Sequence, residues 1–246
     1  AGDDGEGGKI RDSLHREGLD TSGLLIRSDA SSQVAFIVVE KGSGKRTIFW
    51  RRPTGREVSP EELKPGFPGD SRFLLLDGLM KDVSLYAAAQ AVEAGIPVML
   101  DAGRLREGMT EIAKRCDFVV GSEEFAKDLG YNGDLKKFHG KIKDLGFKIT
   151  TITLGERGSI TFLKDRIIEI DAFDVATVDT TGAGDVFHGG YIYGLLRGWP
   201  LEDTIRFASA LAAMKCLRLG GRAGIPDLQA VLAFLKRRGI FLPGGF

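Results

Sequence analysis

The sequence predicts an α/β fold in which a mostly parallel sheet lies between two layers of helices, with a small β hairpin attached. From residue 71 onward, short apolar segments alternate with segments of helical periodicity. The apolar segments are continuous rather than alternating with polar residues, which is typical of strands that are buried on both faces. Before residue 53, by contrast, the chain carries segments rich in β-branched and aromatic residues, which favour strands.

The N-terminal part predicts a small antiparallel unit. Its first ten residues are rich in glycine and acidic residues and are expected to form a loop, and Gly42–Gly44 is expected to turn a hairpin. The expected strands are 22–27, 32–40 and 45–52. Four prolines within 53–70 indicate a linker. The unit is too small to have a core of its own, so it is interpreted as a flap or lid. The predicted division is therefore 1–52, a partial β lid and N-terminal remnant; 53–70, a linker; and 71–246, the α/β domain.

The α/β domain follows as an alternation of the two element types. The expected strands are 72–78, 96–101, 116–121 and 148–155, followed by a hairpin of 159–164 and 166–170. One helix should begin at Ser122, because a serine cap is followed there by two acidic residues in the first turn. The other expected helices are 82–94, 105–115, 134–145, 183–197, 201–217 and 227–238.

Composition excludes several classes of function. Lys+Arg and Asp+Glu both number 34, so the chain has no charge excess for binding nucleic acid or an anionic membrane. No apolar run approaches the roughly 20 residues that span a bilayer, and the acidic start is unlike a secretory signal. Cys116 and Cys216 lie in apolar contexts and are expected to be reduced, half-buried thiols of a cytoplasmic protein. The three histidines have no paired spacing that would indicate a metal site.

The strongest functional signal is DTTGAGD at 179–185. Its small residues precede a predicted helix, so the backbone N–H groups of Gly182, Ala183 and Gly184 would be uncovered at the positive end of that helix, where an anionic phosphoryl group can bind. The carboxylate of Asp185 would repel phosphate but could accept a proton from an attacking hydroxyl. The alternative interpretation is a glycine turn capped by an aspartate.

This motif, followed by a helix rich in small residues, resembles the C-terminal signature of the ribokinase family, the phosphofructokinase B group of carbohydrate kinases. Further segments resemble that family in the family's order: GDD at 2–4, GKRTIFW at 44–50, DAGR at 101–104, TLGERG at 153–158 and RLGGRAGIP at 218–226. The resemblance implies a ribokinase-like three-layer α/β/α fold with a β lid. It also implies ATP-dependent transfer to a sugar hydroxyl with Mg²⁺ and K⁺, and a homodimer formed through the lid.

The resemblance assigns roles residue by residue. Asp185 would be the base, with the anion hole at 182–184. Substrate would contact Asp101 and Arg104, although the same pair could form a structural salt bridge. Glu124 would hold Mg²⁺ through water, but Gly121 stands where the family has asparagine, and a helix-start acid is the alternative. The nucleotide would contact Thr153, Gly155, Gly158, Thr181 and Gly221, and K⁺ would bind beside Asp179 and Thr181. His188 is expected to be packed or half-exposed rather than catalytic, and the lysines within 136–143 are expected to form a solvated helix face.

The family normally opens with a further strand, a substrate-binding aspartate and a GGxxxN segment, none of which is found here. We therefore expect a truncated or partly recorded chain, or one that has lost its sugar-binding half. Three functions stay open: a carbohydrate kinase, a nucleoside or vitamin kinase on the same fold, and a non-catalytic nucleotide-binding protein. The retained Asp185 argues against the third. The segments 129–143 and 214–221 are faintly similar to ketohexokinase-type members, which favours a keto sugar.

Overall fold

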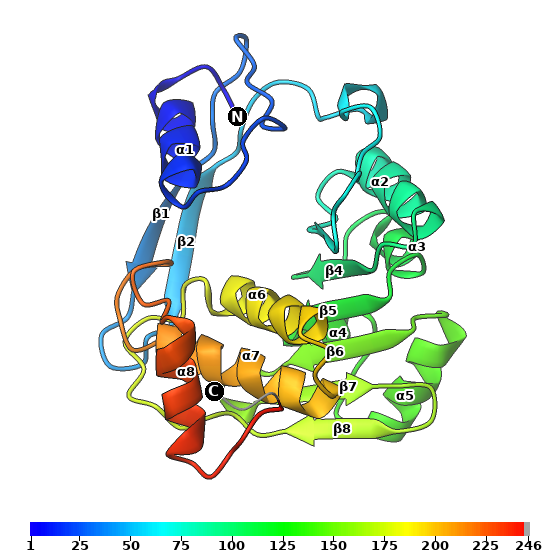
Figure 1. The fold of residues 1–246 in the computed structure, drawn as a ribbon, viewed down its shortest axis with the longest axis vertical. Coiled ribbons are helices and arrows are strands. Elements are labelled where there is room, and N and C mark those ends of the chain that lie inside the picture. Colours follow the sequence, from blue (N-terminus) through cyan, green and yellow to red (C-terminus); the bar gives the residue numbers. More distant parts are fainter. Residues whose placement is uncertain (244–246) are drawn as a thin grey trace.

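A six-stranded sheet forms the centre of the protein in the computed structural model, which describes residues 1–243 (Figure 1). Its strands follow sequence order and are β3 (Leu74–Leu76), β4 (Val98–Ala102), β5 (Phe118–Ser122), β6 (Ile149–Thr153), β7 (Ser159–Phe162) and β8 (Ile167–Ile170). The first four strands run parallel, and the last two continue the sheet antiparallel to their neighbours. The predicted, mostly parallel sheet is therefore confirmed.

Two helical layers cover this sheet. On one face lie α2 (Lys81–Glu93), α3 (Met109–Ala113), α4 (Glu123–Asp128) and α5 (Leu135–Asp144); on the other lie α6 (Ala183–Leu196) and α7 (Leu201–Lys215), with α8 (Leu228–Lys236) packed outside them. Successive strand residues point to opposite faces. Leu100 therefore packs under α2 and α3, whereas Met99 packs against Phe187 and Tyr191 of α6, and both strand residues are fully buried.

The N-terminus contains a helix where we predicted a loop. Helix α1 (Gly5–Arg16) begins after Asp4, whose carboxylate accepts hydrogen bonds from the N–H of Gly7 at 2.7 Å and from the N–H and hydroxyl of Ser32 at 2.8 and 2.7 Å. A capped first turn offsets the low helix propensity of the glycines that follow. The predicted loop is therefore wrong, because the cap at Asp4 and its bonds to Ser32 stabilise a helix that the glycine content alone does not favour.

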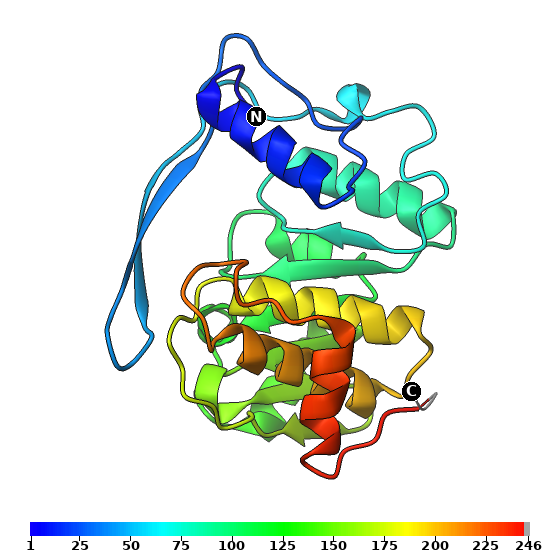
Figure 2. The ribbon, with the colours of Figure 1, turned by 60° about the vertical axis from the view of Figure 1, so that its left-hand side comes forward.

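The predicted hairpin is confirmed, and the strand predicted before it is wrong. Strands β1 (Val34–Val39) and β2 (Arg46–Arg51) pair antiparallel, and Figure 2 shows them extending along one side of the molecule. Residues 22–27 form no strand; they contribute a single bridge, between Arg27 and Gly2. The apolar residues there are only half-buried or exposed, so no partner strand holds them extended.

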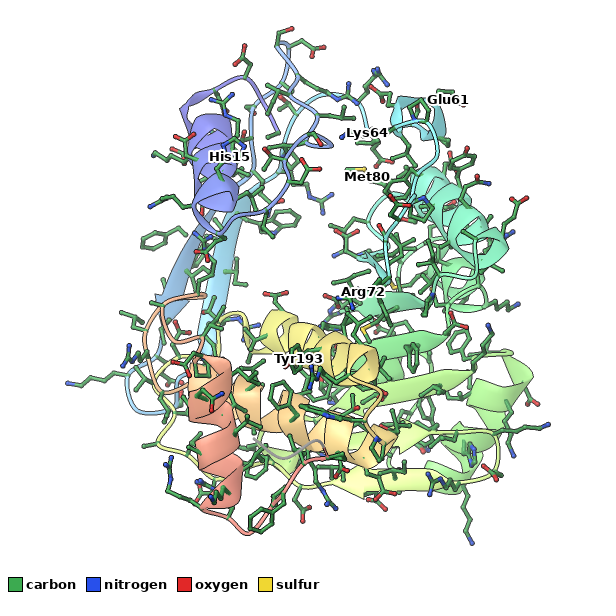
Figure 3. The ribbon with its side chains drawn as sticks, viewed as in Figure 1. His15, Glu61, Lys64, Arg72, Met80 and Tyr193 are labelled. Atoms are coloured by element: carbon green, nitrogen blue, oxygen red, sulfur yellow. The ribbon has the colours of Figure 1, made fainter. Side chains whose placement is uncertain are left out.

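The N-terminal unit is joined to the segment that leads into the sheet. The guanidinium of Arg27 donates to both carboxylate oxygens of Glu62 at 3.1 and 3.0 Å, next to the short helix η1 (Pro60–Glu62), and Lys64 donates to Ser22. In Figure 3, His15 on α1 lies across from Lys64, near α2. These contacts position α1 and the hairpin relative to the first strands of the sheet.

Two remaining predictions concern the cysteines and membrane-spanning segments. Both thiols are free and buried, and Cys116 is completely so rather than half-buried. Burial raises the pKa of Cys116 to about 12. No helix in the described part of the chain is both long and apolar enough to cross a bilayer.

Candidate functional site

Three carboxylates gather at the ends of the first parallel strands. Asp77 follows β3, Asp101 lies near the end of β4, and Asp185 lies in the first turn of α6. Parallel strands end at one edge of the sheet, where open α/β folds bind ligands. Burial raises the pKa of Asp101, and the negative charges of Asp185 and Asp77 add to the effect, while the nearby His188 opposes it. The edge is therefore acidic.

The loop that precedes α6 has the geometry expected of an anion hole. Gly182 precedes the helix with φ +76°, and a Cβ placed there would lie 2.7 Å from the carbonyl oxygen of Gly221. The N–H of Ala183 donates to the carbonyl of Thr180 at 3.2 Å. The N–H groups of Gly182 and Gly184 have no partner among the described residues. Two of the three predicted amides are thus left for a ligand, at the positive end of a helix.

Asp179 holds this loop from the inside. It is buried, and its carboxylate accepts hydrogen bonds from the N–H of Thr181 at 2.8 Å and the N–H of Gly220 at 2.7 Å. Burial alone would raise the pKa of Asp179, but the bonds from Thr181 and Gly220 and the charge of Lys215 together lower it. Asp179 therefore stays ionised and ties the loop to the 218–226 segment.

The turn of the hairpin rests on the same loop, a contact that sequence reasoning missed. Gly44 accepts hydrogen bonds from the N–H and the hydroxyl of Thr180, both at 3.1 Å. Arg46 donates to the Thr180 hydroxyl at 3.0 Å. The signal in the sequence is the glycine of the GKRT segment, which indicates a close approach: a Cβ at Gly44 would lie 2.6 Å from the side chain of Thr177 and 3.2 Å from the backbone of Val178.

His188, expected to be packed or half-exposed, is buried one turn into α6. Its Nδ1 lies 2.7 Å from the carbonyl oxygen of Gly184, and its Nε2 lies 3.2 Å from that of Val120 and 3.6 Å from a carboxylate oxygen of Asp101. Because each ring nitrogen lies within hydrogen-bonding distance of a backbone carbonyl, the side chain holds the two backbone segments that carry those carbonyls together. His188 therefore links the loop before α6 to the ends of β4 and β5.

The predicted nucleotide turn lies at the end of β6. The hydroxyl of Thr153 donates to the carbonyl of Gly121 at 3.2 Å, so it ties two strand ends together. The chain then passes through η2 (Gly155–Arg157) to Gly158, where φ is +85° and a Cβ would lie 2.0 Å from the carbonyl oxygen of Ile170. Gly155 is exposed and has open space around it, which leaves room for a ligand beside the backbone.

The remaining predicted residues lie at the same edge. Glu124 is exposed in the first turn of α4, and Arg104 is exposed beyond the end of β4. Gly121 has a packing explanation, since a Cβ there would lie 2.6 Å from the ring of Phe125. Within residues 1–243 no three His, Cys, Asp or Glu side chains cluster as a metal site. Glu124 is therefore a candidate Mg²⁺ contact only through water and substrate phosphate.

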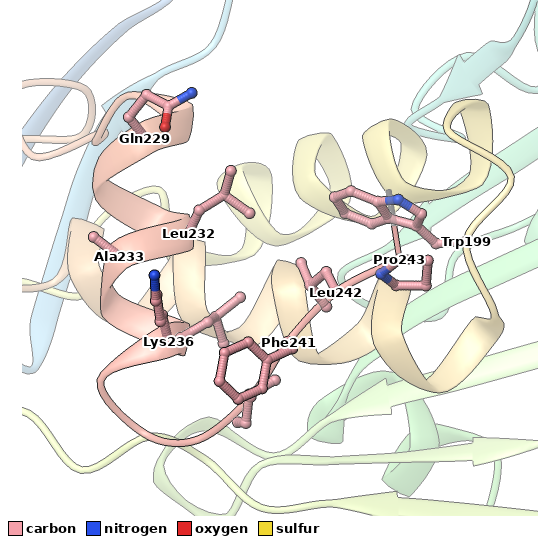
Figure 4. A pocket seen from close by; sticks show the side chains of 10 residues that line it. Trp199, Gln229, Leu232, Ala233, Lys236, Phe241, Leu242 and Pro243 are labelled. Carbon is pink, nitrogen blue, oxygen red and sulfur yellow. The ribbon is translucent and has the colours of Figure 1, made fainter. Parts of the chain in front are cut away.

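A hollow of about 260 Å³ lies elsewhere, between α8 and the segment that follows it (Figure 4). Apolar side chains dominate its lining, among them Trp199, Leu232, Phe241 and Leu242. It contains none of the predicted site residues. The strand-end edge, which carries the charged groups, is therefore the better candidate for phosphoryl transfer.

Comparison with known proteins gives the same picture. The chain is 27% identical over 244 residues to a ribokinase of Haemophilus influenzae, covering 96% of this chain and 79% of that protein. It is 26% identical over 244 residues to a nucleoside kinase of Methanothermobacter thermautotrophicus, covering 97% and 78%. Both relatives are similar along nearly all of this chain.

Solved structures share the fold. The ribokinase of Thermotoga maritima superposes with a TM-score of 0.82 at 27% identity, covering 96% of this chain and 79% of the other. A putative ribokinase II from E. coli, in complex with ATP and Mg²⁺, superposes with a TM-score of 0.84 at 19% identity, covering 96% and 81%. The family model described as pfkB family carbohydrate kinase matches residues 1–228, which include the acidic strand ends, the hairpin and the loop before α6. With the match extending over almost the whole chain, this protein belongs to the pfkB family of carbohydrate kinases.

Proposed function

We propose that the protein transfers the γ-phosphoryl group of ATP to a hydroxyl of a small sugar, with Asp185 as general base. The observation that carries the proposal is the placement of Asp185 in the first turn of α6, directly after the unpartnered N–H groups of Gly182 and Gly184. An anion hole and a carboxylate side by side suit in-line transfer, in which one stabilises the moving phosphoryl group and the other takes the proton of the attacking hydroxyl.

ATP and Mg²⁺ are the cofactors we propose. The E. coli relative was solved with both. In this chain the exposed turn around Gly155 and the Gly221 segment, which packs on the loop before α6, would hold the nucleotide phosphates. Glu124 would hold Mg²⁺ through water. When bound, Mg²⁺ would neutralise phosphate charge and polarise the transferring group.

The chain's own groups would act in a fixed order. Asp101 and Arg104 would orient the acceptor hydroxyl at the strand ends. Asp185 would accept the hydroxyl proton as the oxygen attacks the phosphorus, the bond to the ADP oxygen would break, and the N–H groups of Gly182 and Gly184 would stabilise the oxygens in flight. No covalent enzyme intermediate is needed, because a single in-line transfer to the acceptor hydroxyl completes the reaction.

Two classes of acceptor are candidates for the substrate, sugars and nucleosides. Polar Asp101 and Arg104 favour a sugar over an aromatic base, while the similarity to a nucleoside kinase keeps nucleosides as the second candidate. A coupled ADP-release assay over fructose, ribose, 2-keto-3-deoxygluconate, adenosine and hydroxymethylpyrimidine decides between them. The protein assayed should carry any residues encoded before Ala1. Faster turnover on adenosine or the pyrimidine than on every sugar would refute the sugar proposal; nucleotide binding without any turnover would favour a non-catalytic role.

The hairpin is also proposed to pair two subunits. Its apolar side chains stay exposed on both faces: Phe36 opposite Phe49 on one, and Ile48 and Trp50 on the other. Exposed apolar strands of this kind are typical of interfaces. A second copy would cover them. Light scattering at high micromolar concentration should report a dimer; a monomer there would refute the pairing without touching the kinase proposal.

Potassium is the third cofactor that the resemblance implies, beside Asp179 and Thr181. The buried hydroxyl of Thr181 has no hydrogen-bond partner among the described residues, which is compatible with a cation ligand. The carboxylate of Asp179 already accepts two backbone N–H groups, and the ammonium of Lys215 lies against the carbonyl of the same residue. The size of any potassium effect therefore depends on how much positive charge that lysine supplies.

A further inference from the structure

Lys215 is a lysine with no exposed surface in the last turn of α7. Lysine is almost never fully buried without a partner, because moving an ammonium out of water costs several kcal/mol. Its Nζ donates to the backbone carbonyl of Asp179 at 2.9 Å, and it forms no ion pair within the described part of the chain. This buried charge is thus directed at the residue that begins the DTTGAGD loop.

The end of α7 makes two further contacts around Lys215, one with residues 178–179 and one with the 218–226 segment. The carbonyl of Cys216 accepts the N–H groups of Val178 and Asp179 at 2.8 and 3.2 Å. A Cβ at Gly224 would lie 2.3 Å from the carbonyl oxygen of Lys215, so the 218–226 segment closes over the helix end. The negative end of the α7 dipole and the carboxylate of Asp179 both favour a cation at this point. The site is therefore built to hold positive charge without a solvent path.

The positive charge of Lys215 lies close to an acidic edge of the sheet. The edge where phosphate must bind carries the carboxylates of Asp77, Asp101 and Asp185, and each of them repels the anionic nucleotide. A cation fixed on the inner side of the loop, with unpartnered N–H groups on its outer side, offsets this repulsion and needs no reorganisation during the reaction.

We propose that Lys215 is a positioning residue whose ammonium serves as a built-in monovalent cation beneath the phosphoryl-binding loop, replacing most of the contribution that potassium would make there. The lysine acts through Asp179 and the loop and does not touch substrate. This inference rests on the proposed kinase function for its kinetic consequences only. Its structural consequence, a loop held by an internal cation, is independent of the acceptor.

Three variants test the proposal. Lys215→Met keeps a similar length and apolar volume but removes the charge. Because it leaves the buried carboxylate of Asp179 without the facing ammonium, its melting temperature is measured beside its activity. Lys215→Ala also leaves a space that a small cation can enter. Lys143→Met is the matched control, because Lys143 lies in the last turn of α5 but is exposed.

We expect wild-type kcat to change by no more than about twofold between potassium and tetramethylammonium salts at matched ionic strength. Lys215→Met should lower kcat by about tenfold or more in tetramethylammonium, the size of effect expected when an electrostatic group at such a site is removed, while KM for the acceptor changes less. In Lys215→Ala, potassium or methylammonium should restore part of the lost activity. Lys143→Met should behave as wild type in both salts.

A second readout does not need turnover. The melting temperature of Lys215→Ala and its affinity for ADP by calorimetry should rise with potassium or methylammonium, and those of the wild type should not. If Lys215→Met keeps wild-type kcat in tetramethylammonium, or if neither cation changes Lys215→Ala in either readout, the proposal is wrong. If the wild type phosphorylates no acceptor, the kinase proposal fails, and the melting and affinity measurements still decide the role of Lys215.

Discussion

Gly182, the last residue of the DTTGAGD loop before α6, gives the sharpest test of the proposed site. Gly182 has φ +76°, and a Cβ there would lie 2.7 Å from the carbonyl oxygen of Gly221 and 3.4 Å from its Cα. For Gly182→Ala the left-handed backbone alone costs about 1–2 kcal/mol. The neighbouring atoms are backbone, so one of the two loops must move as well. At roughly 2–4 °C per kcal/mol for a chain of this size, the strain alone lowers the melting temperature by about 2–8 °C.

The effect on catalysis should be larger than the effect on folding. Moving the loop carries the N–H groups of Gly182 and Gly184 away from the transferring group, and loss of one such donor typically lowers kcat by about 10²–10³. The assay is ADP release with the best acceptor, beside a thermal melt. Gly189→Ala is the matched control: Gly189 is exposed on α6 with open space around it, so alanine there should stabilise the helix by about 1 kcal/mol and leave kcat unchanged.

Two results would refute this reasoning separately. A Gly182→Ala protein with kcat within about threefold of wild type would show that the loop is not the anion hole. An unchanged melting temperature would show that the close approach of Gly182 to Gly221 is not rigid.

Three further predictions use other parts of the structure. Asp185→Asn should bind ATP within a few-fold of wild type but lose at least ~10² in kcat, and turnover above a tenth of wild type would contradict the base assignment. Hydrogen bonds from Arg27 lower the pKa of Glu62 to about 2, so the stabilising contribution of this carboxylate is complete above about 4.5, its ordinary pKa, and is lost as the pH falls toward 2. The free energy of unfolding of Glu62→Gln should therefore depend less on pH in that range than that of the wild type. Equal pH dependence in the two proteins would contradict the pairing. With its pKa raised to about 12, buried Cys116 should resist alkylation at pH 8 until the protein is unfolded, and rapid labelling of native protein would show that this core opens.

The sheet could be predicted from the sequence because its signal is local. Strands buried on both faces are continuous apolar runs, and the helices between them have clear caps such as Ser122, which accepts the N–H of Phe125. Helix α1 could not be predicted in the same way. Its first turn depends on Ser32, 28 residues beyond the capping Asp4, and a contact at that separation leaves no trace in the composition of residues 1–10.

The same distinction applies to the site. DTTGAGD could be interpreted from its own residues, because a helix start, small residues and a carboxylate are all contiguous. The groups that support it come from elsewhere in the sequence. Gly44 and Arg46 lie more than 130 positions before the loop, and Gly220 follows it after both α6 and α7. The burial of Lys215 could not be predicted for a related reason. A lysine at the end of a helix normally faces water, but here residues 178–179 and the 218–226 segment both lie against the end of α7, and Lys215 is buried.

Charges of opposite sign lie on the two sides of the loop before α6, and we propose that they have different roles. The outer edge is negative, and Asp185 must be a free carboxylate there if it is to take a proton as proposed. Burial raises the pKa of Asp101, and the charges of Asp185 and Asp77 raise it further. The inner side holds the opposite charge, in Lys215 and the positive end of α6. In the proposed transfer a base and an anion site lie next to each other, so the negative charge of the base opposes the binding of phosphate. If Lys215 acts as proposed, a cation behind the loop attracts phosphate together with the amides in front of it and does not occupy the space where Asp185 would take the hydroxyl proton.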